Sequence, residues 1–406
     1  MKKLLCILIV LLLAVPARAS VVINLTDALL LSDDGVCLTE KGVYSRIVPL
    51  GGGLYAATKA DTGLVCVLNG EGENVSDKDY SFAASSGGRI ILTSGLYSAL
   101  FDFEMNRLTP FAYRLIAAGE DGGFLAFKTD IWDDTADRVY YLDADGNEYP
   151  TQNTILYAFS MEGGLPALAV DGRSGLTGYM NGWGEWMTPA EYLSAGAFHG
   201  LYAAASVKDG TGLIDRDGDW ILKPEYDSVR VTDKLILSVK GTLRQVYAVR
   251  EKRLTSLYSG TNGVSLLNNG FVIYGEDGAM LMNTDGSLNA RFGPDTILYD
   301  GSGNGIIVSE YEGMYLYDMV SRVTSDGFLA ITPLGGGLYK TCSESTNEDA
   351  PRYLFGVMDD SGTELLKPIY EAVEYPGNNL LAARSGNVIT LFTITNGEAA
   401  ETSVFE

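Results

Sequence analysis

Residues 212–229 read GLIDRDGDWILKPEYDSV, and they are the clearest copy of a pattern that recurs along the chain. A short apolar segment, GLID, enters the turn RDG, and a second apolar segment, WILK, leaves it and runs to Pro224. Short segments rich in β-branched and aromatic residues, separated by an Asp-Gly pair, are typical of two strands joined by a tight hairpin turn. The stretch therefore predicts a β-hairpin, and the fold depends on how often this hairpin recurs.

Glycines recur in register with the turn of this hairpin, at or just before the start of the second strand. They are Gly35, Gly72, Gly146, Gly184, Gly218, Gly286, Gly362 and Gly397. Where one repeat separates two of them, the interval is about 36 residues, which is the length of a blade or solenoid repeat. Three segments without glycine occupy the equivalent place: 103–106 (FEMN), 250–253 (REKR) and 319–322 (MVSR).

Two further markers have the same period. The phrase PLGGGLY occurs at residues 49–55 and again at 333–339. A proline follows the second strand of five hairpins, at Pro110, Pro150, Pro189, Pro224 and Pro368. Together the markers predict about ten repeats between Ala28 and Asn387, followed by a half repeat over residues 388–406.

The repeats determine the expected fold class. One repeat cannot bury its apolar face alone, whereas stacked neighbours bury a continuous core. No segment after the N-terminal leader shows a sustained helical period. We therefore predict an all-β tandem array of blade-like, propeller-like units, with an open β-solenoid as the alternative. About ten units exceed the usual number of blades in a propeller, so two small rings, one large ring and an open superhelix all remain open.

Three segments resemble the WG repeat of bacterial proteins, in which a strand, a glycine turn, a second strand and a proline closely followed by tyrosine succeed one another. They are residues 177–198, 211–231 and 355–375. The signature tryptophan of that family is replaced here by Thr177, Thr211 and Phe355, and the Trp183-Gly184 pair lies in a hairpin turn instead. The resemblance implies an architecture and not an activity.

The N-terminus has the pattern of an export signal. Two lysines precede an apolar run over residues 4–15, and Ala17-Arg18-Ala19 fits the rule for signal-peptide cleavage. The run is short for a membrane-spanning helix, although an uncleaved anchor is the alternative. We predict a signal peptide over residues 1–19 and a secreted or extracytoplasmic repeat array over residues 20–406.

The charge of the chain restricts its partners. There are 52 acidic residues against 29 Lys and Arg, and the formal net charge is −23. An acidic surface repels phosphate backbones and anionic lipids. We therefore expect no nucleic-acid partner and, after signal cleavage, no membrane partner.

Cysteines do not define the fold. Only Cys37, Cys66 and Cys342 follow the leader, and this odd and small number predicts no disulfide framework in an exported protein. A pair between Cys37 and Cys66 remains open, because their spacing does not decide it.

The DRDGD stretch also resembles part of a calcium loop. A helix-flanked calcium loop needs a bidentate Glu at its twelfth position, and counting from Asp215 this position holds Tyr226. Asp and Gly are also the residues that tight turns require. We therefore predict a turn here, and no metal or cofactor site; weak calcium binding at a turn stays open.

No catalytic constellation stands out. His199 is the only histidine, so histidine triads and multi-histidine metal sites are not expected. Trp183, Trp186 and Trp220 can stack on sugars, but aromatic residues at repeat-register positions more often form the core between repeats. Carboxylates are abundant, and none of them is marked out as a catalytic pair.

These observations predict an exported, monomeric, non-enzymatic recognition protein that presents its repeat surface to a protein or glycan partner at the cell surface or outside it. The alternative is a secreted carbohydrate-active enzyme that uses paired carboxylates. The sequence identifies no binding residue.

Overall fold

The computed structural model describes residues 21–25, 28–32, 36–118, 122–129, 137–158, 167–171, 173–250, 253–301, 303–346, 351–377 and 379–405. The predicted signal peptide lies outside these ranges. Every regular element within them is a β-strand. None of the described residues belongs to a helix that is long and apolar enough to cross a membrane.

The chain divides into two compact units, residues 1–79 and 80–406. The first contains a two-stranded sheet and a three-stranded sheet, whose strands are β1 (Val21–Asn24), β2 (Ala28–Leu31), β3 (Tyr44–Gly51), β4 (Leu54–Lys59) and β5 (Val65–Leu68). Buried side chains of both sheets, among them Leu30, Ile47 and Cys66, form one core cluster.

The second unit contains the other eight sheets that the described residues form. In chain order, their strands are β6 (Phe82–Ser86), β7 (Arg89–Ser94), β8 (Tyr97–Phe101); β9 (Leu115–Ala118), β10 (Phe124–Thr129), β11 (Asp137–Leu142), β12 (Glu148–Ala158), β13 (Ala167–Asp171), β14 (Thr177–Met180), β15 (Trp186–Tyr192); β16 (Ser194–Ala195), β17 (Tyr202–Val207), β18 (Gly210–Asp215), β19 (Trp220–Tyr226); β20 (Ser228–Val231), β21 (Leu235–Lys240), β22 (Leu243–Arg250), β23 (Arg253–Gly260); β24 (Gly263–Leu267), β25 (Gly270–Gly275), β26 (Gly278–Asn283), β27 (Leu288–Phe292); β28 (Ile297–Asp300), β29 (Gly305–Glu310), β30 (Gly313–Asp318); β31 (Ala330–Gly335), β32 (Leu338–Glu344), β33 (Tyr353–Asp359), β34 (Glu364–Tyr370); and β35 (Ala372–Gly377), β36 (Leu380–Ser385), β37 (Val388–Thr395), β38 (Glu398–Phe405).

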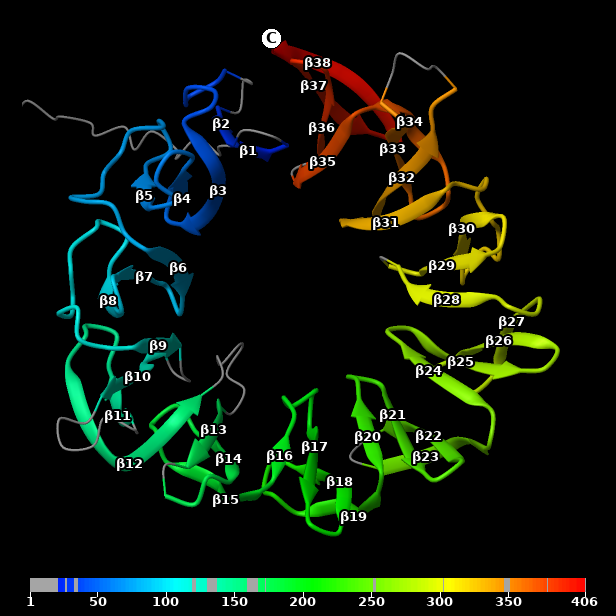
Figure 1. The fold of residues 1–406 in the computed structure, drawn as a ribbon, viewed down its shortest axis with the longest axis horizontal. Helices are drawn as coiled ribbons and strands as arrows, with labels where there is room; N and C mark the ends of the chain where they lie inside the picture. The colour runs from blue at the N-terminus through cyan, green and yellow to red at the C-terminus, as the bar shows by residue number, and fades with distance from the viewer. Residues whose placement is uncertain are drawn as a thin grey trace, which may run out of the picture. The chain divides into compact units, whose positions relative to one another are not determined.

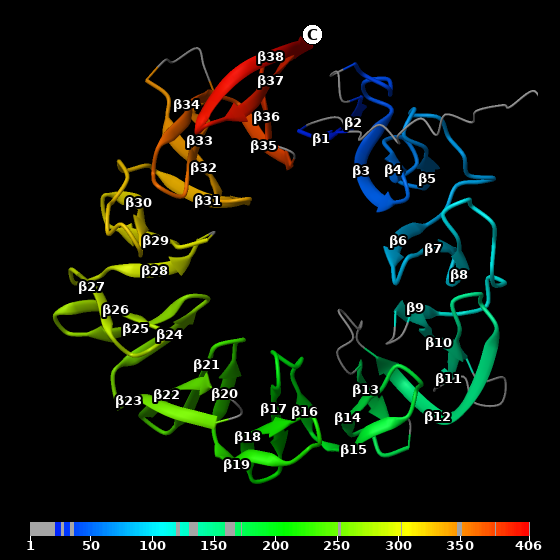
Figure 2. The ribbon, with the colours of Figure 1, turned by 180° about the vertical axis from the view of Figure 1, so that it is seen from behind.

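The sheets are blades of the propeller type. Within each, the strands pair in chain order as an antiparallel meander, for example β16-β17-β18-β19 and β35-β36-β37-β38. In Figures 1 and 2 the sheets of residues 80–406 follow one another in the order of the sequence. The predicted all-β array of propeller-like units is confirmed. The solenoid alternative is not, because consecutive strands pair within a sheet rather than between repeats.

The boundaries of the sheets do not coincide with the boundaries of the sequence repeats. The opening hairpin, β18–β19, supplies the third and fourth strands of its sheet, and the chain then begins a new sheet at β20. Each repeat defined by its hairpin therefore contributes to two blades. The half repeat at the C-terminus, β37–β38, completes the last sheet as its third and fourth strands.

The DRDGD stretch is the tight turn between β18 and β19. The backbone N–H groups of Asp217 and Asp219 both donate to the Asp215 carboxylate at 3.0 Å, and Gly218 N–H donates to the Asp215 carbonyl at 3.1 Å. Gly218 has a φ of 86°, in the left-handed region that favours glycine. The predicted turn is therefore confirmed. At two of the segments without glycine, Met105 and Arg322 take up this conformation, with φ values of 63° and 61°.

A second constraint acts on the turn glycines. A Cβ on Gly218 would lie 3.0 Å from the Thr188 side chain on the last strand of the preceding blade. Thr188 is itself buried, and its hydroxyl accepts a hydrogen bond from the backbone N–H of Tyr179 at 3.2 Å. The turn of one blade thus packs closely against a buried threonine of its neighbour, and a residue with a Cβ would have to displace that side chain.

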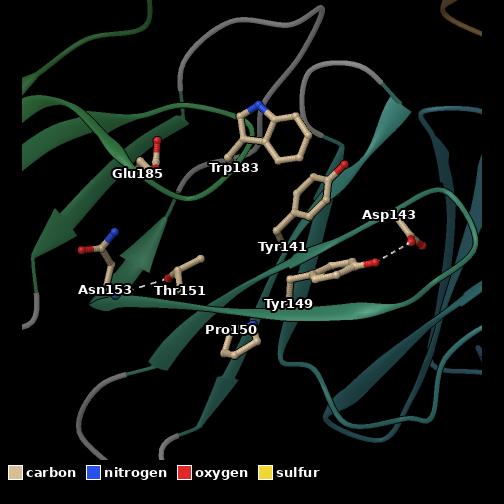
Figure 3. A pocket seen from close by; sticks show the side chains of 8 residues that line it. All are labelled: Tyr141, Asp143, Tyr149, Pro150, Thr151, Asn153, Trp183 and Glu185. Carbon is tan, nitrogen blue, oxygen red and sulfur yellow. Dashed lines mark hydrogen bonds between the residues drawn. The ribbon is translucent and has the colours of Figure 1, made fainter.

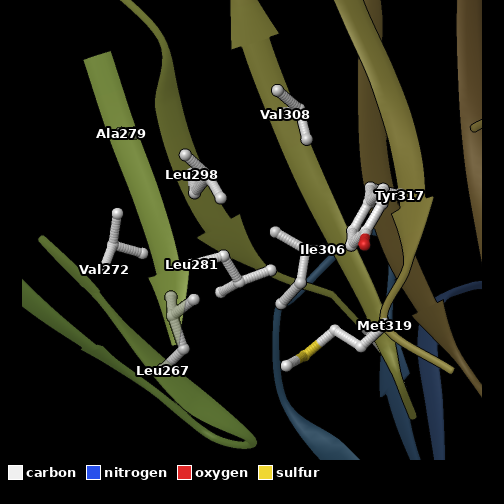
Figure 4. Packing of buried hydrophobic residues seen from close by; sticks show 9 residues of the cluster. All are labelled: Leu267, Val272, Ala279, Leu281, Leu298, Ile306, Val308, Tyr317 and Met319. Atoms are coloured by element: carbon white, nitrogen blue, oxygen red, sulfur yellow. The ribbon is translucent and has the colours of Figure 1, made fainter. Parts of the chain in front are cut away.

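The apolar core lies between neighbouring blades. Figure 4 shows one such interface, where Leu267, Val272 and Leu281 face Ile306 and Val308 of the next sheet. This cluster joins two consecutive sheets, so stability is built from contacts between nearest neighbours.

Trp220 belongs to one of these interfaces, as predicted. It packs, half-buried, against a cluster that contains Tyr179 and Phe198. Its ring meets that of Tyr192 edge to face, with centroids 6.0 Å apart and an interplanar angle of 89°. The ring also covers Gly212, where a Cβ would lie only 2.6 Å from it.

The three cysteines among the described residues are free thiols, with Cys37 exposed and Cys66 and Cys342 buried. The Cys37–Cys66 pair left open by the sequence is therefore not formed.

Candidate binding site

The most distinctive pocket lies where two blades share a strand. β12 pairs with β11 through Leu142↔Glu148 and with β13 through Tyr157↔Val170, so β9–β15 form one seven-stranded sheet. β12 thus serves as the last strand of one blade and the first strand of the next. A cavity of about 730 Å³ opens over this shared strand.

Three elements supply the pocket lining, which Figure 3 shows. β11 and the turn that follows it supply Tyr141 and Asp143, β12 supplies Tyr149, Pro150, Thr151 and Asn153, and the turn between β14 and β15 supplies Trp183 and Glu185. None of these lining residues is a lysine, an arginine or a histidine.

One wall of the pocket is aromatic. The ring centroids of Tyr141 and Trp183 lie 4.3 Å apart at an interplanar angle of 34°, and those of Tyr141 and Tyr149 lie 6.0 Å apart at 40°. The side chains of Trp183 and Tyr149 are 47% and 51% exposed, respectively. Large apolar rings are therefore presented to the surface instead of being used in the core.

Hydrogen bonds fix the turn that carries Trp183. The backbone N–H groups of Trp183 and Glu185 donate to the Asn181 side-chain oxygen at 3.0 and 2.9 Å. The side-chain amide of Asn153 donates to the Gly184 carbonyl at 2.5 Å and ties the turn to β12. A Cβ on Gly184 would lie 2.9 Å from the Thr151 methyl group, so glycine lets the turn approach the strand closely.

Asp143 contributes a fixed negative charge. Its carboxylate accepts hydrogen bonds from the Asn147 side-chain amide and backbone N–H, each at 2.8 Å, and from the Asp145 N–H at 3.0 Å. The Tyr149 hydroxyl also donates to it at 3.4 Å. The bonds from Asn147 are the main reason why the pKa of Asp143 is below its ordinary value, so the group is ionised at neutral pH.

The remaining polar groups of the wall bond largely to the protein. The Thr151 hydroxyl donates to the Val139 carbonyl at 2.8 Å and accepts from the Asn153 N–H at 3.2 Å. The exposed Glu185 carboxylate accepts from the Asn181 side-chain amide at 3.3 Å. The pocket therefore combines aromatic faces with two carboxylates.

Trp183, Trp186 and Trp220, which the sequence assigns to one class, have different environments in the structure. Trp186 packs in the core against the cluster that contains Leu125 and Met180, and Trp220 packs at the next interface. Only Trp183 lines the pocket. A signal for it exists in the repeat: the same turn position holds Asp145, Asp217, Asp285 or Ser361 in other hairpins, so a tryptophan there departs from the pattern.

Sequence reasoning missed Tyr141, Tyr149, Asp143 and Glu185. Each has an ordinary residue type for its repeat position, and only the shared strand β12 and the approach of the Trp183 turn bring them together.

Other candidate groups do not assemble into a site. The His199 Nδ1 lies 3.7 Å from an Asp233 carboxylate oxygen, and both side chains are exposed. Over the described ranges, no group of three or more His, Cys, Asp or Glu side chains is placed to hold a metal ion.

Solved structures with a similar course of the chain differ widely in sequence. A eukaryotic initiation factor matches at 10% identity over 87% of this chain and 97% of that chain, with a TM-score of 0.44. Hsv2 of Kluyveromyces lactis matches at 11% identity over 60% of this chain and 96% of that chain, with a TM-score of 0.31. Sqt1 of Saccharomyces cerevisiae matches at 9% identity over 86% of this chain and 100% of that chain, with a TM-score of 0.29.

The sequence matches no curated protein. The family model of the WG containing repeat matches residues 212–233 and 355–388, which cover the opening stretch and a second of the segments that resemble this repeat. With the blade structure of both segments in view, the chain contains WG repeats over these two segments.

Proposed function

We propose that the protein is an exported, non-enzymatic recognition protein that binds a protein or glycan partner through the Trp183 pocket. The aromatic wall carries this proposal. Half-exposed Trp and Tyr rings, held in place by a hydrogen-bonded turn, are the kind of residue that dominates binding energy. A cavity of about 730 Å³ lies in the usual range for ligand sites.

The negative charge of the chain supports a partner that is not a nucleic acid. With a net charge of −23, the surface disfavours phosphate backbones and anionic membranes. A segment of protein or a saccharide can offer apolar faces that pack on aromatic rings and hydrogen-bond donors for carboxylates.

The state of Asp143 argues against one of the two carboxylate roles in glycoside hydrolysis, that of the acid. A hydrolase of that class needs one carboxylic acid that remains protonated to donate a proton to the leaving group, usually through a raised pKa. The pKa of Asp143 is shifted downward, chiefly by the hydrogen bonds from Asn147. At this position the pocket supplies a carboxylate and no proton donor.

The proposal is tested by capture. Immobilised protein is exposed to a glycan array and to cell-surface extracts, and the same is done with Trp183→Ala. A matched control is Val320→Ala, which removes another exposed apolar side chain, 73% exposed, from a turn remote in the sequence. We expect Trp183→Ala to lose the captured partner and Val320→Ala to retain it, with no cleaved product released. Equal capture by Trp183→Ala and the parent would refute the proposed site, and a partner that is turned over would refute the non-enzymatic role.

A further inference from the structure

We propose that the Trp183 pocket selects an alkylated ammonium cation, either free or carried by a larger partner. This inference rests on the proposed function, because it assigns a ligand class to the same pocket. It follows from three features of the wall: the charge of its carboxylates, the use of its polar hydrogens, and the arrangement of its rings.

The charge of the wall is negative without a cation of its own. Asp143 and Glu185 are the charged side chains among the lining residues. Arg89 reaches the turn that carries Asp143, but its guanidinium donates to the backbone carbonyls of Ala144 and Gly88, each at 3.0 Å. A cationic ligand would supply the counter-charge that the wall does not itself contain.

Three of the polar groups of the wall donate hydrogen bonds to the protein. The Thr151 hydroxyl donates to the Val139 carbonyl, the Tyr149 hydroxyl donates to Asp143, and the Asn153 amide donates to the Gly184 carbonyl. A neutral sugar presents hydroxyls that need donors as well as acceptors. The wall is therefore better suited to a ligand that requires few donors from the protein.

The hydrogen bonds that Asp143 already accepts favour an alkylated ammonium over a bare one as ligand. Each of its two oxygens already accepts two hydrogen bonds, from the backbone N–H groups of Asp145 and Asn147 on one oxygen and from the Asn147 amide and the Tyr149 hydroxyl on the other. A carboxylate has about four lone-pair sites, so these bonds use its acceptor capacity while its charge remains. It can attract a cation through its field without accepting an N–H bond, and a quaternary ammonium has no N–H to donate.

The rings complete the match. The faces of Trp and Tyr carry negative electrostatic potential and attract alkylated ammonium groups, with Trp the strongest of the aromatic side chains. Trp183, Tyr141 and Tyr149 meet at centroid distances of 4.3 and 6.0 Å beside the carboxylate of Asp143. The alkyl groups would contact the rings while the charge is shared between rings and carboxylates.

The test compares a cation with its neutral isostere. Choline chloride and 3,3-dimethylbutan-1-ol have the same shape, and only choline is charged. Titration calorimetry at low salt should show choline binding at least about tenfold more tightly than the alcohol, and more tightly than methyl glucoside, with affinity falling as salt rises. Equal binding of choline and the alcohol, tighter binding of the glucoside, or no binding of choline would overturn the inference.

Variants locate the effect. Trp183→Ala and Asp143→Asn should each lower choline affinity at least about tenfold. The matched control is Asp215→Asn, because Asp215 accepts the same backbone bonds in the equivalent turn of the β18–β19 hairpin and lies outside the pocket lining. We expect it to leave choline binding unchanged, and a loss in Asp215→Asn equal to that in Asp143→Asn would contradict the assignment.

The two proposals fail in different ways. If capture of the partner depends on Trp183 but choline neither binds nor competes with it, the cation assignment is wrong and the proposed site stands. If choline binds at the pocket and competes for the captured partner, the ammonium group belongs to that partner. If choline binds without competing, the ligand is a free cation. If Trp183→Ala changes neither capture nor choline binding, both proposals are wrong.

Discussion

Replacing Trp220 with alanine tests whether the core lies between blades. The indole packs against the cluster between its own blade and the preceding one, meets Tyr192 edge to face and covers Gly212. Truncating a fully buried Trp typically costs about 3–5 kcal/mol, part of it transfer and part cavity. Because Trp220 is half-buried, we expect a loss of about 2–3 kcal/mol.

The assay is native-state hydrogen exchange, because a repeat array need not unfold in one step. Trp220→Ala should speed exchange in the strands on either side of the interface, which are β13–β15 of the seven-stranded sheet and the sheet β16–β19, and should affect distant sheets less. The matched control is Trp183→Ala, which removes the same side chain from an exposed turn and should cost less than about 1 kcal/mol. Unchanged exchange in Trp220→Ala, or an equal loss in both variants, would refute the inter-blade account.

Three further outcomes are expected. Sequencing of the exported protein should begin at Ser20, because Ala17-Arg18-Ala19 fits the cleavage rule, and a retained Met1 in a membrane fraction would contradict it. The melting temperature should not respond to calcium in the parent or in Asp215→Asn/Asp217→Asn, since the Asp215 carboxylate already caps its own turn; a calcium-dependent rise in the parent that the double variant loses would contradict the turn. Asp143 has a pKa in the folded protein below its ordinary 3.8, so its contribution to stability is present above about pH 4 and is lost as the pH falls through the lowered value. The free energy of unfolding of Asp143→Asn, measured as a function of pH, should therefore lack this loss at acid pH. A pH dependence equal to that of the parent would contradict the hydrogen bonds assigned to the turn.

The repeat was predictable because its markers are local. A turn with φ near 86° at Gly218 favours glycine, and the same preference at most of the hairpins creates a period that is visible in the sequence. The predicted blade type followed from this period. The second role of Gly218, its approach to Thr188 of the preceding blade, was not predictable, because it depends on a contact between neighbouring repeats.

The boundaries of the sheets were not predictable for a related reason. The most distinctive turn joins the third and fourth strands, so a repeat defined by that turn begins in the middle of a blade. The step from one sheet to the next, between Tyr226 and Ser228, has no comparable marker. The buried hydroxyls of Thr109 and Thr188, which accept from the third strand at 2.9 and 3.2 Å, were likewise not identified, although each directly precedes a marker proline.

The pocket illustrates the limit of sequence reasoning most clearly. From the sequence, core packing is the favoured interpretation for Trp183, as for the other tryptophans near the repeat register. That interpretation was correct for Trp186 and Trp220 and wrong for Trp183, which is 47% exposed. The difference arises because Trp183 stands at the tip of a turn, where no strand neighbour covers it, and because β12 continues beneath it into the next blade.

Hydrogen exchange of the parent, with and without its captured partner or choline, tests the binding site most directly. We predict that protection on binding is concentrated in the turn over residues 181–185 and in the first half of β12, where the lining residues lie. Protection that leaves both segments unchanged and appears in other sheets instead would show that the Trp183 pocket is not where this protein binds.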